Sequence, residues 1–179
     1  MKTQVILACD DKGKFLEYIP KEAGHTGDGR KHLGISVLVY NHKGQVLLQR
    51  RKHKVFDNIW DLTGATHPLH KKDGTDESLE EATLRCLKRE YDIENIKLKN
   101  LGAFNYFAKI DNICENEHCF MMIGEYNGPV SLDTEVGYEY KWVYKEEFLI
   151  DIKKNPNKYS AWAKEGVYIL TASGFFDKV

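Results

Sequence analysis

The chain has 179 residues, of which 42% are hydrophobic and 30% charged, a composition typical of a globular protein with one sizeable core. The formal net charge of −1 at pH 7 gives no electrostatic reason to expect a nucleic acid or a membrane surface as partner. Four cysteines, none in a C-x-x-C pair, favour the reducing cytoplasm, and no apolar stretch approaches the roughly 20 residues that span a bilayer.

The first third of the chain is predicted to form short strands and polar loops. Apolar runs on either side of residues 10–13 predict two strands joined by a turn, and a glycine-rich charged loop follows at 20–31. Residues 32–51 contain the clearest hairpin pattern, two apolar runs joined at 41–44. A basic loop then enters a strand with the sequence DLTGATH, residues 61–67.

A helix is expected over residues 75–93, because apolar residues recur there at helical spacing. Ser78 and Glu81 match a capping box at its start. Later segments are predicted as two strands, a strand that turns into a helix, and a C-terminal helix, over residues 96–110, 116–126, 138–155 and 157–176 respectively. Strands outnumber the interspersed helices, which predicts an α/β or α+β sandwich around a mixed sheet.

Three carboxylates occupy unusual positions. Glu90 lies eleven residues after Leu79, about three helical turns, so it falls within the apolar stripe of the predicted helix. There it needs a cation, a metal or several donors, unless it reaches solvent at the helix end. Glu115 and Glu117 point to the same side of a strand. They repel each other unless a cation lies between them, one holds a proton, or both are solvated at an exposed edge.

Three histidines could complete a metal site with Glu115 and Glu117. His25 and His32 flank the glycine-rich loop, and His67 ends a predicted strand. Such a nitrogen and oxygen ligand set suits Mn²⁺, Mg²⁺, Zn²⁺ or Fe²⁺. Nearby cations suit a phosphate or diphosphate, the alternative being solvated loop charges. These cations are Lys21, Arg50, Arg51, Lys52 and Lys54.

Taken together, these segments resemble type 1 isopentenyl-diphosphate isomerase, a member of the Nudix superfamily. The likeness runs through KEAGHTGDGRKHL, GQVLLQRR, a W-x6-H spacing, EEATLRCLKRE and ENEHC, and it covers most of the chain. It implies a Nudix fold, α/β (α+β), with a mixed β-sheet sandwiched between α-helices. It also implies a single Nudix domain over residues 1–179.

The resemblance implies roles for specific residues. A first site for Mg²⁺ or Mn²⁺, or Zn²⁺ at the histidines, would consist of His25, His32, His67, Glu115 and Glu117. A second, substrate-linked Mg²⁺ would lie at Glu90. The substrate-binding residues would be Lys21, Arg51, Lys54 and Trp162. Glu117, Glu90 and Tyr106 would be catalytic, because carboxylates move protons and aromatic faces stabilise a carbocation-like transition state.

The chain departs from the family at one catalytic position. Ala65 stands where the family has its proton-bearing cysteine, two residues before the His-Pro pair. The general Nudix box, G-x5-E-x7-R-E-U-x-E-E-x-G-U, is only partly present. Three positions match it, namely Glu77, Arg85 and Glu90, and four do not, namely Lys71, Cys86, Arg89 and Asp92.

Three functions therefore stay open. The first is an enzyme on isoprenoid diphosphates with altered isomerase chemistry, in which Thr66 or Cys119 relays the proton. The second is a metal-dependent hydrolase of a nucleoside or isoprenoid diphosphate that uses Glu90, Glu117 or Glu77. The third is a non-catalytic diphosphate-binding protein. In each case the partner is a small-molecule diphosphate, and the chain is expected to be a monomer or a homodimer.

Overall fold

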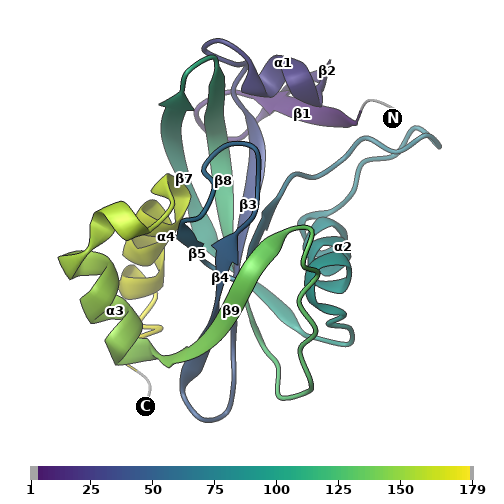
Figure 1. Ribbon diagram of the computed structural model, residues 1–179. Helices are drawn as coiled ribbons and strands as arrows, with labels where there is room; N and C mark the ends of the chain where they lie inside the picture. The colour runs from purple at the N-terminus through teal and green to yellow at the C-terminus, as the bar shows by residue number, and fades with distance from the viewer. Residues whose placement is uncertain (1–3, 178–179) are drawn as a thin grey trace.

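Nine strands form one mixed sheet with helices on both sides in the computed structural model, which describes residues 4–177 (Figure 1). The strands are β1 (Val5–Cys9), β2 (Phe15–Pro20), β3 (His32–Tyr40), β4 (Gln45–Arg51), β5 (Trp60–Asp61), β6 (Gly64–Thr66), β7 (Leu98–Ile110), β8 (Ile113–Glu125) and β9 (Gly137–Tyr144). The helices are α1 (Lys21–His25), α2 (Leu79–Tyr91), α3 (Lys145–Lys154) and α4 (Ala161–Ala172), with a 3₁₀ turn, η1 (Pro156–Lys158), before α4.

The predicted hairpin of residues 32–51 is present only at its turn. β3 and β4 share the single pair Tyr40 and Val46 and then separate. The DLTGATH segment lies between them as two short strands rather than one, because β5 pairs with β4 and β6 pairs with β3. Thr63 bridges the opening: its Oγ1 accepts from the Val39 amide at 2.8 Å and donates to the Leu47 carbonyl at 2.7 Å.

Other predicted elements agree with the structure or need small corrections. The loop predicted at 20–31 begins with the short helix α1, and the strand after residues 111–112 starts earlier than predicted, at Ile113. The capping box of α2 is confirmed, since the Ser78 hydroxyl accepts from the Glu81 amide at 3.1 Å and Glu81 accepts from the Ser78 amide at 2.7 Å. The predicted C-terminal helix consists of η1 and α4.

Two apolar layers hold the helices against the sheet. One joins the sheet to α3 and α4 and includes Leu38 and Val167, and the other joins it to α2 and includes Val37 and Leu87. Successive residues of β3 thus face opposite layers, as strand geometry requires. Figure 1 shows α2 on one side of the sheet and α3 and α4 on the other. The predicted sandwich of a mixed sheet between helices is confirmed.

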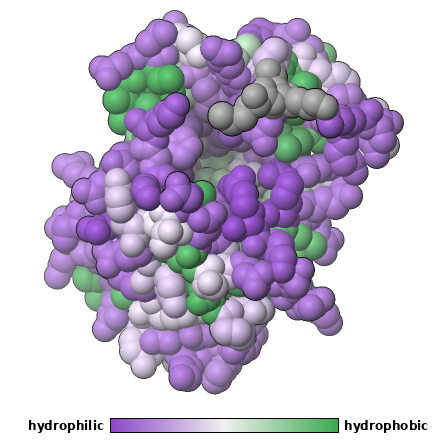
Figure 2. All heavy atoms as spheres, turned by 45° about the vertical axis from the view of Figure 1, so that its right-hand side comes forward, coloured by the Kyte–Doolittle hydropathy of each residue, from purple (hydrophilic) through white to green (hydrophobic). Residues whose placement is uncertain are grey.

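The face drawn in Figure 2 is largely hydrophilic, with hydrophobic residues in small separate groups. Among residues 4–177, no helix is long and apolar enough to cross a membrane.

Candidate metal and diphosphate site

Five side chains that are far apart in the sequence meet at one end of the sheet. Each offers a ligand atom, and these atoms all lie within 4.8 Å of one another: His25, His32, His67, Glu115 and Glu117. The strand register explains the meeting, because β3 and β8 run parallel with His32 paired to Glu117. β6 pairs with the other edge of β3, and His67 follows directly after Thr66, the last residue of β6. The predicted convergence is therefore found, and metal binding by this cluster stays a prediction.

Hydrogen bonds fix the orientation of two histidines. His25 Nδ1 donates to the Lys21 carbonyl at 2.7 Å, and His32 Nδ1 donates to the Arg30 carbonyl at 2.8 Å. In the neutral imidazole, each Nε2 then carries a lone pair rather than a proton. Within residues 4–177 both Nε2 atoms are buried without a hydrogen-bond partner, although His25 Nε2 lies 3.2 Å from Glu115 Oε2. Lone pairs facing carboxylate oxygens need a cation between them, so this cluster fits a divalent metal.

The protonation states of His67 and Glu117 suit metal binding, whereas burial raises the pKa of Glu115, and Glu115 outweighs burial to raise the pKa of His25. Burial lowers the pKa of His67 to about 3, in spite of its 2.8 Å contact from Nε2 to Glu117 Oε1. Burial alone would raise the pKa of Glu117, but the imidazoles of His32 and His67, whose Nε2 atoms lie 3.5 and 2.8 Å from Glu117 Oε1, outweigh it and hold that pKa well below its usual range. Neutral imidazole and ionised carboxylate are the forms that coordinate metals.

Two glycines make room for the cluster. A Cβ atom at Gly34 would lie 2.1 Å from Glu117 Oε2, and one at Gly24 would lie 2.8 Å from His32 Nδ1. Neither glycine has a positive φ, so the requirement is for space rather than for backbone conformation. Sequence reasoning missed both residues, although each lies close in the sequence to a predicted ligand.

An aromatic wall borders the cluster. The Tyr106 hydroxyl donates to Glu117 Oε2 at 2.7 Å, and the rings of Tyr106 and Trp162 are 5.9 Å apart. The Arg51 guanidinium lies over the Trp162 ring, 4.7 Å from its centroid. The structure therefore brings Tyr106, Trp162 and Arg51 together, as the resemblance implied.

Asp61 holds this wall in place and was not predicted. Its fully buried carboxylate accepts from Trp162 Nε1 at 2.8 Å, from Ser160 Oγ at 2.8 Å and from Arg51 Nη1 at 3.2 Å. The Leu62 amide is a fourth donor. Four donors, one of them charged, are what a buried carboxylate requires. Only the fold brings these donors together, so the sequence held no signal for this role.

The predicted diphosphate lysines differ in position. Burial lowers the pKa of Lys21, with the charge of Glu115 acting in the opposite direction and that of Arg89 in the same direction. Lys21 is the first residue of α1, and its carbonyl accepts the His25 Nδ1 hydrogen bond. Lys54 lies on the exposed loop between β4 and β5. On the same loop, the pKa of His53 is lowered by burial and then by the charges of Arg51 and Lys21.

Glu90 is buried, as its helical phase predicts, with 5% exposure. It lies beside Gly64 of β6, where an added Cβ would be 3.4 Å from Glu90 Oε2. Gln49 Nε2 donates to the same oxygen at 3.2 Å, and Arg89 forms an ion pair with Oε1. Glu90 lies outside the five-residue cluster, and its role as a metal ligand stays a prediction.

Glu77 and Arg85, two residues of the Nudix box, hold the segment that carries His67. Arg85 donates to both Glu77 oxygens, at 2.7 and 2.8 Å, and to the His67 carbonyl at 2.9 Å. The Leu69 amide also donates to Glu77, at 3.1 Å. Glu77 therefore orients the His67 segment from outside the cluster, and its role around a metal in the hydrolase hypothesis stays a prediction.

Position 65 and its proposed substitutes lie close to the cluster. Ala65 is half-buried on β6, paired with Ser36 of β3. The Cys119 thiol is 3.2 Å from the Ser36 hydroxyl, and burial raises its pKa well above the usual range. Cys119 therefore keeps its proton at neutral pH. Thr66 is buried beside Ala65.

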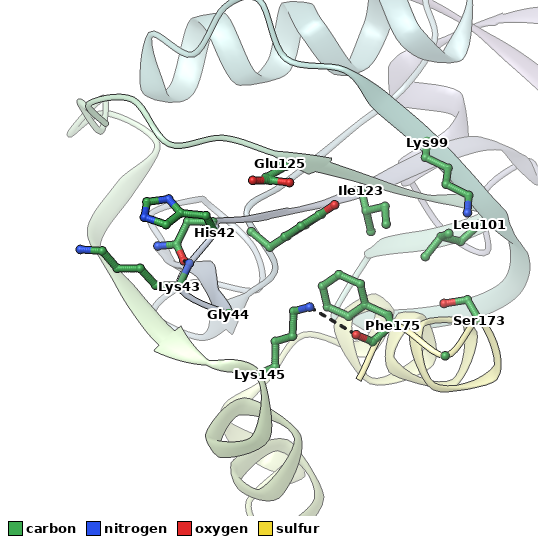
Figure 3. A pocket seen from close by; sticks show the side chains of 13 residues that line it. His42, Lys43, Gly44, Lys99, Leu101, Ile123, Glu125, Lys145, Ser173 and Phe175 are labelled. Atoms are coloured by element: carbon green, nitrogen blue, oxygen red, sulfur yellow. Dashed lines mark hydrogen bonds between the residues drawn. The ribbon is translucent and has the colours of Figure 1, made fainter. Parts of the chain in front are cut away.

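A separate cavity of about 520 Å³ lies at the other end of the sheet (Figure 3). It includes Tyr40, eight residues along β3 from His32 and roughly 26 Å away at about 3.3 Å per residue. Lys145 Nζ donates there to the Phe175 carbonyl at 3.4 Å. None of the five cluster residues lines this cavity, so the candidate chemistry lies at the other end of β3.

A family model described as NUDIX domain matches residues 30–163. The chain belongs to the Nudix family. Among curated relatives, isopentenyl-diphosphate delta-isomerase 2 of Aromatoleum aromaticum is 28% identical over 165 residues, covering 90% of this chain and 83% of the relative. An isopentenyl-diphosphate delta-isomerase of Escherichia coli is 28% identical over 166 residues, covering 90% and 88%. These relatives agree with the resemblance seen in the sequence.

Solved structures show the same fold. A Deinococcus radiodurans protein superposes with a TM-score of 0.62 at 14% identity, covering 85% of this chain and 90% of that one. A MutT protein from Methanosarcina mazei gives 0.60 at 22% identity, covering 83% and 96%. The Ap4A hydrolase of C. elegans gives 0.55 at 16% identity, covering 82% and 98%. The Nudix fold predicted from the sequence is confirmed.

Proposed function

We propose that the chain is a divalent-metal-dependent cytoplasmic enzyme that acts on an isoprenoid diphosphate, with the binding site of an isopentenyl-diphosphate isomerase and weakened isomerase chemistry. The observation that carries the proposal is the cluster of five donor atoms within 4.8 Å, in which two buried imidazole nitrogens have no hydrogen-bond partner within residues 4–177. The ion would be Mg²⁺ or Mn²⁺, or Zn²⁺ at the histidines.

The cluster residues supply one half of the isomerisation. A bound divalent cation supplies positive charge that keeps the surrounding carboxylates ionised. Glu117 is then a base, and its Oε2 accepts a 2.7 Å hydrogen bond from the Tyr106 hydroxyl. The faces of Tyr106 and Trp162 can stabilise positive charge on the substrate carbon atoms. Lys21 and Arg51 are the cations for the diphosphate.

The other half of the isomerisation needs a proton donor, and Ala65 has none. A protonated Cys119 or a hydroxyl at Thr66 would have to act from a different place, and displaced groups lose much of the benefit of orientation. We therefore expect a slow isomerase. Ala65 also favours the second candidate, a metal-dependent hydrolase of a nucleoside or isoprenoid diphosphate, because a small residue there lets a phosphate approach the backbone of β6.

One experiment separates these functions. The purified protein is incubated with isopentenyl diphosphate, and separately with a panel of nucleoside diphosphates and their derivatives, in Mg²⁺ or Mn²⁺. The allylic isomer is measured by chromatography and released phosphate by a colorimetric assay. Allylic product without phosphate supports the isomerase, and phosphate release supports the hydrolase. Binding of isopentenyl diphosphate without turnover, measured by calorimetry, would instead support the non-catalytic protein.

A further inference from the structure

The carboxylate of Glu90 differs from the five-residue cluster in the way its charge is balanced. It is buried, yet both of its oxygens already have partners from the protein: Arg89 on Oε1 and Gln49 Nε2 at 3.2 Å on Oε2. A divalent cation at Glu90 would have to displace these donors. In this arrangement the residues around Glu90 do not fit a second metal site, whereas the unpartnered histidine nitrogens of the cluster fit the first.

Arg89 can contact more than Glu90. Its side chain is 48% exposed, so the guanidinium reaches from the buried carboxylate toward solvent. A guanidinium has five N–H donors in a planar fork and binds carboxylate and phosphate oxygens equally well. Arg89 can thus contact Glu90 and still offer N–H donors to a phosphate on its solvent-facing side.

The sequence supports the same conclusion from charge. Arg89 occupies a position at which the general Nudix box has a glutamate. A glutamate there would add a second negative charge beside Glu90, and metal ions would be needed to balance the two charges. An arginine instead places a positive charge beside Glu90. The two carboxylates of the cluster balance one divalent cation, and Arg89 balances Glu90. Lys21 then remains for an anionic substrate.

We propose that Arg89 supplies the positive charge beside Glu90 that a second divalent cation would otherwise carry, and that it binds the diphosphate together with Lys21. The chain would then use one divalent cation per active site. This inference rests on the proposed function, because it assumes a diphosphate substrate.

Mn²⁺ binding followed by electron paramagnetic resonance tests the proposal, because free and bound Mn²⁺ give different signals. The parent, Arg89→Gln and Lys88→Gln are titrated with Mn²⁺, with and without inorganic pyrophosphate. Lys88→Gln is the matched control, because it removes the same charge from the adjacent position of α2. Lys88 pairs with Asp92 and Glu94 at the surface. Pyrophosphate affinity is measured in parallel by calorimetry.

The parent and Lys88→Gln should bind one Mn²⁺ per chain in both conditions. Arg89→Gln should bind pyrophosphate at least about tenfold more weakly, the loss expected for a charge-assisted hydrogen bond, and should take up a second Mn²⁺ when pyrophosphate is present. A parent that binds two Mn²⁺ with pyrophosphate, and loses the second in Glu90→Gln, would overturn the inference and leave the proposed function intact. Equal behaviour of Arg89→Gln and Lys88→Gln would also overturn it. A parent that binds Mn²⁺ but neither pyrophosphate nor isopentenyl diphosphate would refute the proposed function itself, and Arg89 would lose its diphosphate role with it.

Discussion

Gly34→Ala should separate metal binding from folding. The new methyl group would lie 2.1 Å from Glu117 Oε2 and 2.4 Å from Glu117 Cδ, well inside ordinary contact. Either β3 or the Glu117 side chain must move. β3 pairs with β8 over nine consecutive residue pairs, so a shift of the strand would strain the centre of the sheet. Rotation of one side chain costs less, and Glu117 should be displaced by more than an ångström.

The displacement breaks contacts that hold Glu117 as a ligand. The carboxylate loses its 2.8 Å contact with His67 and its 2.7 Å hydrogen bond from Tyr106. Hydrogen bonds to a charged group are worth roughly 1.5–3 kcal/mol each. Loss of an outer-shell partner alone lowers metal affinity about 10–100-fold, so displacement of a ligand should cost at least that much. Overpacking should reduce the free energy of unfolding of the metal-free protein by only about 1–3 kcal/mol.

The assay compares metal affinity with thermal stability. Metal at about 100 times its Kd stabilises the folded state by roughly 2.7 kcal/mol, which at about 2–4 °C per kcal/mol should raise the Tm of the parent by about 5–11 °C. Gly34→Ala should lose most of that shift at the same metal concentration. Gly124→Ala is the matched control. Gly124 lies at the end of β8 far from the cluster, and its added Cβ would lie 2.6 Å from Ile96 Cδ1. This variant should therefore lower stability without changing metal affinity. If Gly34→Ala bound metal as tightly as the parent, the assignment of Glu117 as a ligand would be refuted.

Three further predictions concern neighbouring residues. His67→Ala should lower metal affinity and thermal stability together, while His70→Ala, which removes a pair with Asp76 and a ring contact with Tyr18 outside the cluster, should leave metal affinity unchanged; a metal titration and thermal melts check both. Arg85→Gln should reduce metal affinity about 10–100-fold by releasing the His67 segment, and unchanged affinity in the titration would contradict its positioning role. Ala65→Cys should raise isomerase activity by up to ~10²–10⁴-fold; a folded, metal-loaded variant that binds isopentenyl diphosphate but shows no gain in allylic product would favour the hydrolase.

Periodicity in the sequence predicted most of the fold because it reports local geometry. The capping box at Ser78 and the helical stripe predicted α2, and apolar runs bounded by turns predicted the strands. It could not show that β3 and β4 separate after one pair, because each contains a continuous apolar run, at 37–39 and 46–48, and such runs fit any buried strand. The separation depends on Thr63, whose hydroxyl replaces a strand partner on each side. That contact joins residues far apart in the chain.

The site was predictable to the extent that residue type alone determines chemistry. Histidines and paired carboxylates are rare enough in combination for a resemblance to select them. The residues that hold the site are of ordinary types, and their roles come from tertiary contacts. Gly34 matters because of where Glu117 points, and Asp61 matters because β5 meets the start of α4, where Ser160 and Trp162 donate to it.

The geometry also indicates where binding and chemistry can be separated. Glu117 contacts His67 and Tyr106 and fills the space above Gly34, so we expect any change there to alter metal binding, packing and proton transfer together. Ala65 has none of these contacts to lose: it lies on β6 one residue from Gly64, and the resemblance predicts a thiol at this position. We therefore expect substitutions at position 65 to change the proposed reaction without loss of metal or diphosphate binding. The catalytic identity of this chain is best tested at that position.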